Sequence, residues 1–132
     1  MNWPAWSIDR VLIVFDAAAF LLIGIQAALF HYRQNFIRKT MWIPVVGAPV
    51  FFAAGLILAW YNAPWLRALF AVLMWLAVAE GLAGFYLHFR GVGVRVGGWA
   101  LRNFLIGPPV VLPLMYAALG VLGLIAVYLK GE

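Results

Sequence analysis

The chain has 132 residues and a net charge of +5, with 67% of its residues hydrophobic and only 10% charged. A soluble domain is roughly a quarter charged, so this chain cannot cover itself with a water-facing surface. Because cysteine is absent, disulfides, thiolate metal sites and cysteine-held iron–sulfur clusters are excluded. The basic residues are spread between apolar runs instead of forming a stripe, which argues against nucleic-acid binding.

Four apolar runs are each long enough to cross a bilayer as a helix, since a hydrocarbon core of about 30 Å needs about 20 helical residues. The runs are too long for barrel strands and do not alternate, and a helix satisfies its own backbone hydrogen bonds in lipid. We therefore predict an all-α integral membrane protein with one domain over residues 1–132. The predicted helices lie at about 11–30, 41–61, 66–86 and 104–129.

The first run carries Asp16 and leads directly into His31. A carboxylate inside a bilayer costs enough free energy to suggest a function, which makes Asp16 a candidate for proton or ion handling. Two other interpretations remain open. The carboxyl group bonds to a neighbouring helix or subunit, or it lies close enough to the outer membrane edge to reach water.

The second run opens with two prolines, and a short turn then leads to the third run, which contains Glu80. Glu80, Gly84 and His88 recur every four residues and therefore share one helix face. Such a face can form a proton path, so Glu80 or Asp16 would serve a small proton-coupled transporter.

The fourth run follows a polar, glycine-rich loop and, like the second, opens with two prolines five residues apart. In each half of the chain a glycine also precedes a histidine by seven residues. This spacing predicts two parallel repeats of one helical hairpin, related by an axis along the membrane normal. The matched positions are Gly24 and Gly81, His31 and His88, Pro44 and Pro108, and Pro49 and Pro113.

The sharpest hypothesis joins His31 and His88, which the repeat places at matching depths near one membrane face. Two imidazoles can hold one b-type haem from both sides. Small residues before each histidine, among them Gly24, Gly81 and Gly84, share its helix face and leave room for a flat macrocycle. The alternative is that both histidines are interfacial and reach the headgroups, with the small residues serving helix packing.

Basic residues gather in the segments 31–40 and 88–103, which contain no acid. Since cytoplasmic loops carry an excess of Lys and Arg, we expect both segments on the cytoplasmic side of a plasma (inner) membrane and both termini outside. The arginines of the second segment are candidates for contacts with lipid phosphate. The basic residues are Arg33, Arg38 and Lys39, then Arg90, Arg95 and Arg102; the opposite side has Arg10, Arg67 and Lys130, offset by Asp9 and Glu132.

Reactive side chains are scarce, because the chain has one serine, one threonine and two histidines. No hydrolytic triad can be assembled, and we expect no enzyme activity. We predict first a small accessory or anchor subunit of a larger membrane complex for electron transfer or energy conversion, with the lipid bilayer and other membrane subunits as partners. A b-type haem carrier and a proton-coupled transporter are the alternatives.

Overall fold

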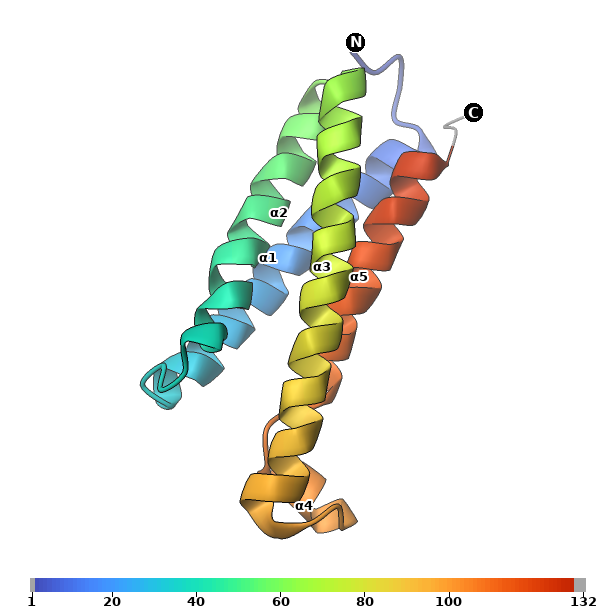
Figure 1. Ribbon diagram of the computed structural model, residues 1–132. Coiled ribbons are helices and arrows are strands. Elements are labelled where there is room, and N and C mark those ends of the chain that lie inside the picture. Colours follow the sequence, from blue (N-terminus) through green and yellow to red (C-terminus); the bar gives the residue numbers. More distant parts are fainter. Residues whose placement is uncertain (1, 130–132) are drawn as a thin grey trace.

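Figure 1 shows the computed structural model, which describes residues 2–129. Within these residues the structure is helical and has no strand. Four segments are long and apolar enough to cross a membrane, which confirms the predicted all-α membrane class. The elements are α1 (Ile8–Arg33), a 3₁₀ turn η1 (Lys39–Met41), α2 (Trp42–Trp60), α3 (Pro64–Gly91), a π-helical turn η2 (Val92–Gly97), α4 (Leu101–Ile106) and α5 (Val111–Tyr128).

The fourth predicted helix, at 104–129, is divided in the structure. The short helix α4 ends at Ile106, and α5 begins only at Val111. The break contains Pro108 and Pro109, which lack an N–H for a helical ladder and disfavour the α conformation in the residue before them. The membrane-spanning part therefore starts later than the hydrophobicity indicates.

The third helix continues well beyond its predicted end at residue 86. It runs to Gly91 and then through η2, and the chain leaves the helical path where Gly97 and Gly98 take φ values of 107° and 126°. Such positive values are accessible to glycine at little cost. The polar residues at this end of α3 are compatible with helix because water at the interface solvates their side chains.

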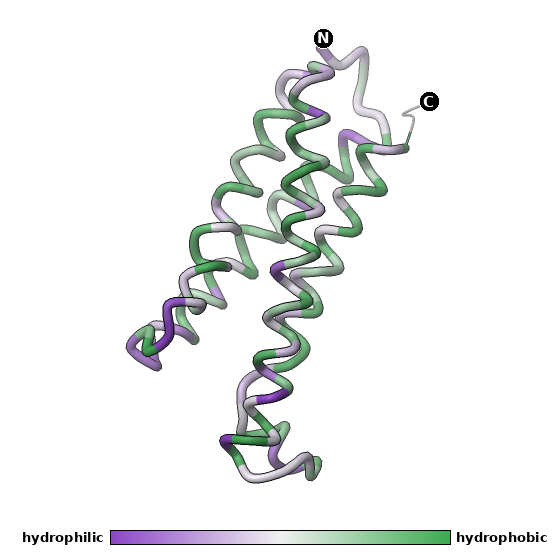
Figure 2. Tube along the Cα trace, in the orientation of Figure 1, coloured by the Kyte–Doolittle hydropathy of each residue, from purple (hydrophilic) through white to green (hydrophobic). Residues whose placement is uncertain are grey.

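The four long helices form two antiparallel pairs, with α1 packed along α2 and α3 packed along α5. Contacts of α1 with α5 and of α2 with α3 join the pairs. In Figure 1 the pairs lie close together where α1 begins and α5 ends, and they diverge toward the two connecting segments. Figure 2 shows that hydrophilic residues concentrate toward the ends of the helices and that their middle parts are mostly hydrophobic. Lys130 and Glu132, used above for orientation, lie outside the described residues.

Small residues allow the close approach within each pair. A Cβ atom added to Gly24 would lie 2.6 Å from the Cβ of Ala48, and one added to Gly81 would lie 2.5 Å from the backbone nitrogen of Ala117. Such contacts bring helix backbones together in membranes, where dispersion and not hydrophobic exclusion drives association. In each helix pair a glycine thus lies against an alanine of the partner helix, and the approach to the backbone is closer in the pair of α3 and α5.

The segment before α1, together with the first turn of α1, hydrogen-bonds to the end of α2. The Trp3 indole N–H donates to the carbonyl of Leu58 at 2.8 Å, and Arg10 Nε donates to that of Ala59 at 3.0 Å. Both carbonyls belong to the last turn of α2 and have no partner within that helix. The Arg10 guanidinium also lies 3.7 Å from the ring centre of Trp6, a cation–π contact.

Arg67 likewise hydrogen-bonds to the end of α5. One of its nitrogens donates to the carbonyl of Val127 at 2.7 Å, and another lies 3.4 Å from a carboxylate oxygen of Asp9 on α1. The guanidinium thus holds the first turn of α3 to the start of α1 and the end of α5. This end of the bundle is consequently tied together, whereas the opposite end spreads apart.

Candidate functional site

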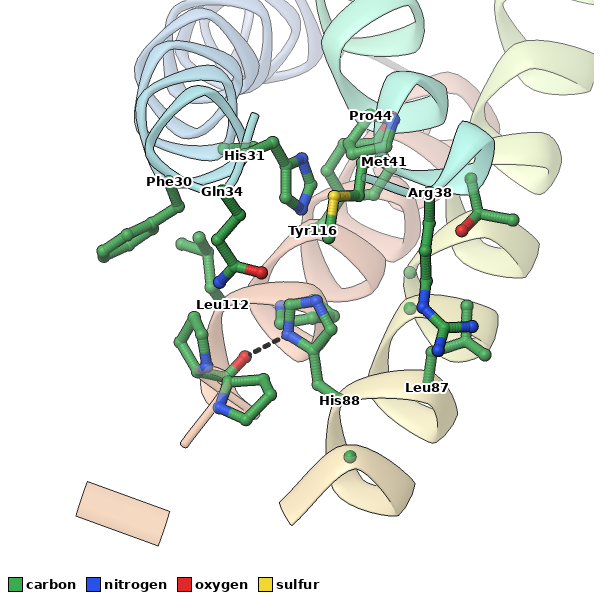
Figure 3. A pocket seen from close by; sticks show the side chains of 18 of the residues that line it. Phe30, His31, Gln34, Arg38, Met41, Pro44, Leu87, His88, Leu112 and Tyr116 are labelled. Carbon is green, nitrogen blue, oxygen red and sulfur yellow. Dashed lines mark hydrogen bonds between the residues drawn. The ribbon is translucent and has the colours of Figure 1, made fainter. Parts of the chain in front are cut away.

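A cavity of about 290 Å³ lies between the two helix pairs at the end where they diverge (Figure 3). Its volume is near the lower limit of roughly 300–1,000 Å³ typical of small-molecule and cofactor sites. Every long helix contributes to its wall. The residues that the sequence singled out and that line the cavity are His31, Glu80, Gly81, Gly84, His88, Arg90 and Arg95.

The two histidines come from different helix pairs and meet across this cavity. Their ring centres are 6.4 Å apart, and the ring planes are perpendicular. In Figure 3 both rings point into the cavity. His31 is in the last turn of α1 and His88 in the last turn of α3, so the parallel direction of these helices brings the rings to the same depth.

The orientation of the His88 ring is fixed by its backbone partner. Its Nδ1 lies 2.6 Å from the carbonyl oxygen of Pro109, in the break before α5. A carbonyl only accepts, so Nδ1 carries the proton and donates it, which leaves a lone pair on Nε2. A hydrogen bond of this kind from one ring nitrogen is what orients most metal-ligating histidines.

His31 is held differently. Its Nδ1 is buried and makes no hydrogen bond of good geometry among residues 2–129, although the backbone of Met41 lies close to the ring. The neighbouring ring of Phe36 lies 6.2 Å away, centre to centre, and itself stacks on Trp42 at 4.0 Å. A buried polar atom without a partner costs free energy and therefore suggests a missing ligand.

The spacing of the rings suits a shared metal centre. A metal ion bound by two imidazole nitrogens at about 2 Å each holds the ring centres about 6 Å apart. Within residues 2–129, however, no group of three or more His, Asp or Glu side chains is placed to hold a metal ion. Two imidazoles alone are therefore an incomplete ligand set for a bare ion.

The predicted small residues divide between two roles. Gly84 lines the cavity, and a Cβ atom added to it would lie 3.2 Å from the ring of Pro113. Gly81 also lines the cavity, and it packs against Ala117. Gly24, by contrast, is not part of the lining and packs against Ala48 of α2. Gly24 therefore packs the two helices together, and its place beside a macrocycle stays a prediction.

Three arginines lie around the cavity, from both helix pairs. Arg38 precedes η1, and Arg90 and Arg95 lie at the end of α3 and in η2. Arg102, which the sequence grouped with them, lies on α4 and is exposed and outside the lining. The cavity thus has a basic rim, suited to an anionic group of a ligand.

Glu80 reaches the deeper part of the cavity and accepts a hydrogen bond of 2.7 Å from the hydroxyl of Tyr116 on α5. Sequence analysis did not identify Tyr116. A tyrosine in the middle of an apolar run needs a partner for its hydroxyl, and that signal could have identified it. The Tyr116 ring packs on Phe20, which also packs on Phe51, with ring centres 5.4 Å and 5.1 Å apart.

Asp16 lies away from the cavity, one helical turn before Phe20 on the same helix. It is 0% exposed, and neither carboxyl oxygen has a hydrogen-bond partner within residues 2–129. The expectation that Asp16 reaches water at the membrane edge is therefore wrong, and so is a bond from its carboxyl group to another helix of the described chain. A Cβ on Gly123 of α5 would lie 2.8 Å from its Oδ2.

The site thus combines two facing histidines, a carboxyl–phenol pair and a basic rim in one cavity between helix pairs. No protein-family model, curated protein sequence or solved structure matches the chain.

Proposed function

We propose that this chain is a membrane subunit for electron transfer that holds one b-type haem between His31 and His88. The observation that carries the proposal is the pair of imidazole rings, 6.4 Å apart across a cavity, each from a different helix pair. A haem iron takes its equatorial ligands from the porphyrin and needs only two from the protein. The chain has two histidines, and both line the cavity, which matches that requirement.

The surroundings of the histidines support the same cofactor. The bond from His88 to the Pro109 carbonyl fixes the tautomer that presents Nε2 to an iron atom. Gly84 keeps the wall of α3 free of side-chain atoms beside this ring. Arg38, Arg90 and Arg95 supply positive charge for two propionates. When bound, a haem supplies one-electron chemistry, and the chain supplies its ligands and its electrostatic surroundings.

A subunit role follows from this chemistry. One haem relays electrons only when a donor and an acceptor both come close to it, and the described residues contain no second candidate redox centre. Many large apolar side chains on the outside, such as Trp60 and Trp65, also offer surface to lipid or to other membrane subunits. The accessory or anchor role and the haem role are therefore one proposal.

The first experiment is a reduced-minus-oxidised absorption spectrum of the protein purified in mild detergent. We expect the sharp α band of a low-spin b-type haem and, after extraction into alkaline pyridine, about one haem per chain. The matched control is protein made in haem-deficient cells, which should acquire the same bands when haemin is added. A colourless preparation that stays unchanged with added haemin would rule out the proposal.

The basic connectors support one orientation in the membrane. Arg33, Arg38 and Lys39 lie at the same end of the bundle as Arg90 and Arg95, where the cavity opens. Because cytoplasmic loops carry an excess of positive charge, we propose that this end faces the cytoplasm and that the termini face outward.

This orientation is testable with single cysteines, because the chain has none. We expect Lys39→Cys and Arg102→Cys, both exposed, to react with a membrane-impermeant maleimide only in inside-out vesicles. Ala5→Cys, exposed at the other end, should react only in right-side-out vesicles. Labelling of Lys39→Cys and Arg102→Cys from opposite sides would contradict a bundle with both connectors at one face.

The helix contacts also support the proposal of two repeated hairpins, in a register that differs from the proline spacing. Gly24 packs on Ala48 and Gly81 packs on Ala117, and each alanine follows a proline by four residues. Those prolines, Pro44 and Pro113, are each the third residue of their helix. We therefore propose that Pro44 corresponds to Pro113, and that η2 and α4 belong to an insertion in the second hairpin.

A further inference from the structure

Glu80 faces two different spaces. Besides the histidine cavity, it lines a groove on the outside of the bundle between α2 and α3. The other walls of this groove are mostly aliphatic and aromatic, from Trp42, Val46, Val50, Leu73 and Leu76. Four of these five are exposed, and in a membrane they face hydrocarbon. A carboxyl group therefore lies where a lipid-soluble molecule can reach it from the side.

A glycine on α2 makes this position of the carboxyl group possible. A Cβ atom added to Gly47 would lie 2.7 Å from Oε1 of Glu80 and 2.7 Å from the hydroxyl of Tyr116. Any other residue at 47 would displace the pair. Three helices thus meet here: α3 carries Glu80, α5 carries Tyr116, and α2 leaves room for both side chains at Gly47.

The carboxyl group and the apolar walls of the groove limit the class of ligand that can bind. The molecule must be apolar enough to enter from the bilayer, and its head must offer a hydrogen-bonding group to a carboxyl group. A phospholipid does not fit, because its polar group stays at the interface and its chains offer no such group. A hydroxyl- or carbonyl-bearing ring on an apolar tail does fit.

We infer that Glu80, which the Tyr116 hydroxyl holds in place, binds the head group of a membrane quinol or quinone whose apolar tail lies in the groove between α2 and α3. The inference rests on the proposed function for its redox meaning, because a quinol donates electrons to a membrane haem and a quinone accepts them. The binding itself depends only on the groove and on the carboxyl group that the phenol holds. Glu80 lines both spaces, so the bound head group lies beside the histidine cavity.

The test is equilibrium binding of a benzoquinone with a ten-carbon tail to the protein in lipid nanodiscs, followed by quenching of tryptophan fluorescence. Trp42 lines the groove and supplies the signal, which Trp42→Phe should reduce. We expect saturable quenching in the wild type. In Glu80→Leu the affinity for the quinone should fall at least tenfold. Gly47→Ala, which keeps the carboxyl group and moves it, should weaken binding in the same direction.

A matched control is Val72→Ala on the lipid-facing side of α3, outside the groove, which should bind as the wild type does. Quenching that is linear in quinone concentration and equal in all variants is simple partition into lipid and would overturn the inference. Equal competition by an alkane of the same length would overturn it too, because the groove would then hold an acyl chain.

The same measurements separate this inference from the proposed function. Protein that lacks haem but shows saturable, Glu80-dependent quinone binding would support the inference while removing the haem proposal. Protein that shows b-type bands but no saturable binding would do the reverse. Circular dichroism of each variant should match the wild type, and Gly47→Ala repeats the test with the carboxyl group still present should Glu80→Leu fail to fold.

Discussion

We expect His31→Ala and His88→Ala each to abolish the low-spin b-type spectrum of the purified protein. Each variant would remove one of the two proposed ligands, and the chain has no third histidine to replace it. Loss of an iron–nitrogen bond costs far more than 1.4 kcal/mol, so the haem content should fall by much more than about tenfold. Pyridine extraction of equal amounts of protein measures the haem directly.

The control for this prediction is Gln34→Ala, which changes another side chain of the cavity wall close to His31. It should retain the spectrum, because an amide is not a haem ligand. Added imidazole should restore low-spin bands in His31→Ala more fully than in His88→Ala, since only His88 also holds the Pro109 carbonyl. Wild-type bands in either alanine variant would show that the haem, if present, is bound elsewhere.

The sequence was sufficient for the membrane class and for the matching depth of the two histidines. Apolar length alone predicts four spans, and equal spacing from Gly24 to His31 and from Gly81 to His88 predicts equal depth on parallel helices. Both arguments depend only on the helical rise per residue, which neighbouring helices do not change. The structure accordingly brings the two rings together.

Rotation of the helices about their axes could not be predicted in this way. Small residues on one face favour both close helix packing and space for a ligand, and only the arrangement of neighbours decides between them. Gly24 therefore packs on α2, whereas Gly84 lines the cavity. The partner of Glu80 was missed for the same reason, because Tyr116 lies 36 residues away on another helix.

The proline-containing break before α5 shows a further limit. No charged residue occurs between 104 and 129, so a search for long uncharged runs extends the fourth helix too far. The consecutive Pro108 and Pro109 indicate the break, since neither has an N–H that can donate to a helical hydrogen bond. This break is also functional in the proposed site, because the carbonyl it leaves free accepts the hydrogen bond of His88.

The packing of α3 on α5 leads to the second large prediction. We expect Gly81→Ala to destabilise the protein by about 2 kcal/mol or more, because overpacking of a tight contact costs about 1–3 kcal/mol and sometimes more. The new Cβ would lie 2.5 Å from the backbone nitrogen and 2.8 Å from the Cα of Ala117, atoms that cannot rotate away. The helix propensity gained by alanine, about 1 kcal/mol, does not offset this. Unfolding in mixed micelles with increasing dodecyl sulfate measures the change.

Gly84→Ala is the matched control one turn further along α3. Its new Cβ would lie 3.2 Å from the ring of Pro113, a side chain that yields by a few tenths of an ångström, so its stability should stay close to that of the wild type. Gly81→Ala should also lose haem, because separation of α3 from α5 moves His88 away from the Pro109 carbonyl that orients it. Equal stability of Gly81→Ala and Gly84→Ala would mean that α3 and α5 are further apart than described, and the position of the His88 ring would then lose its support.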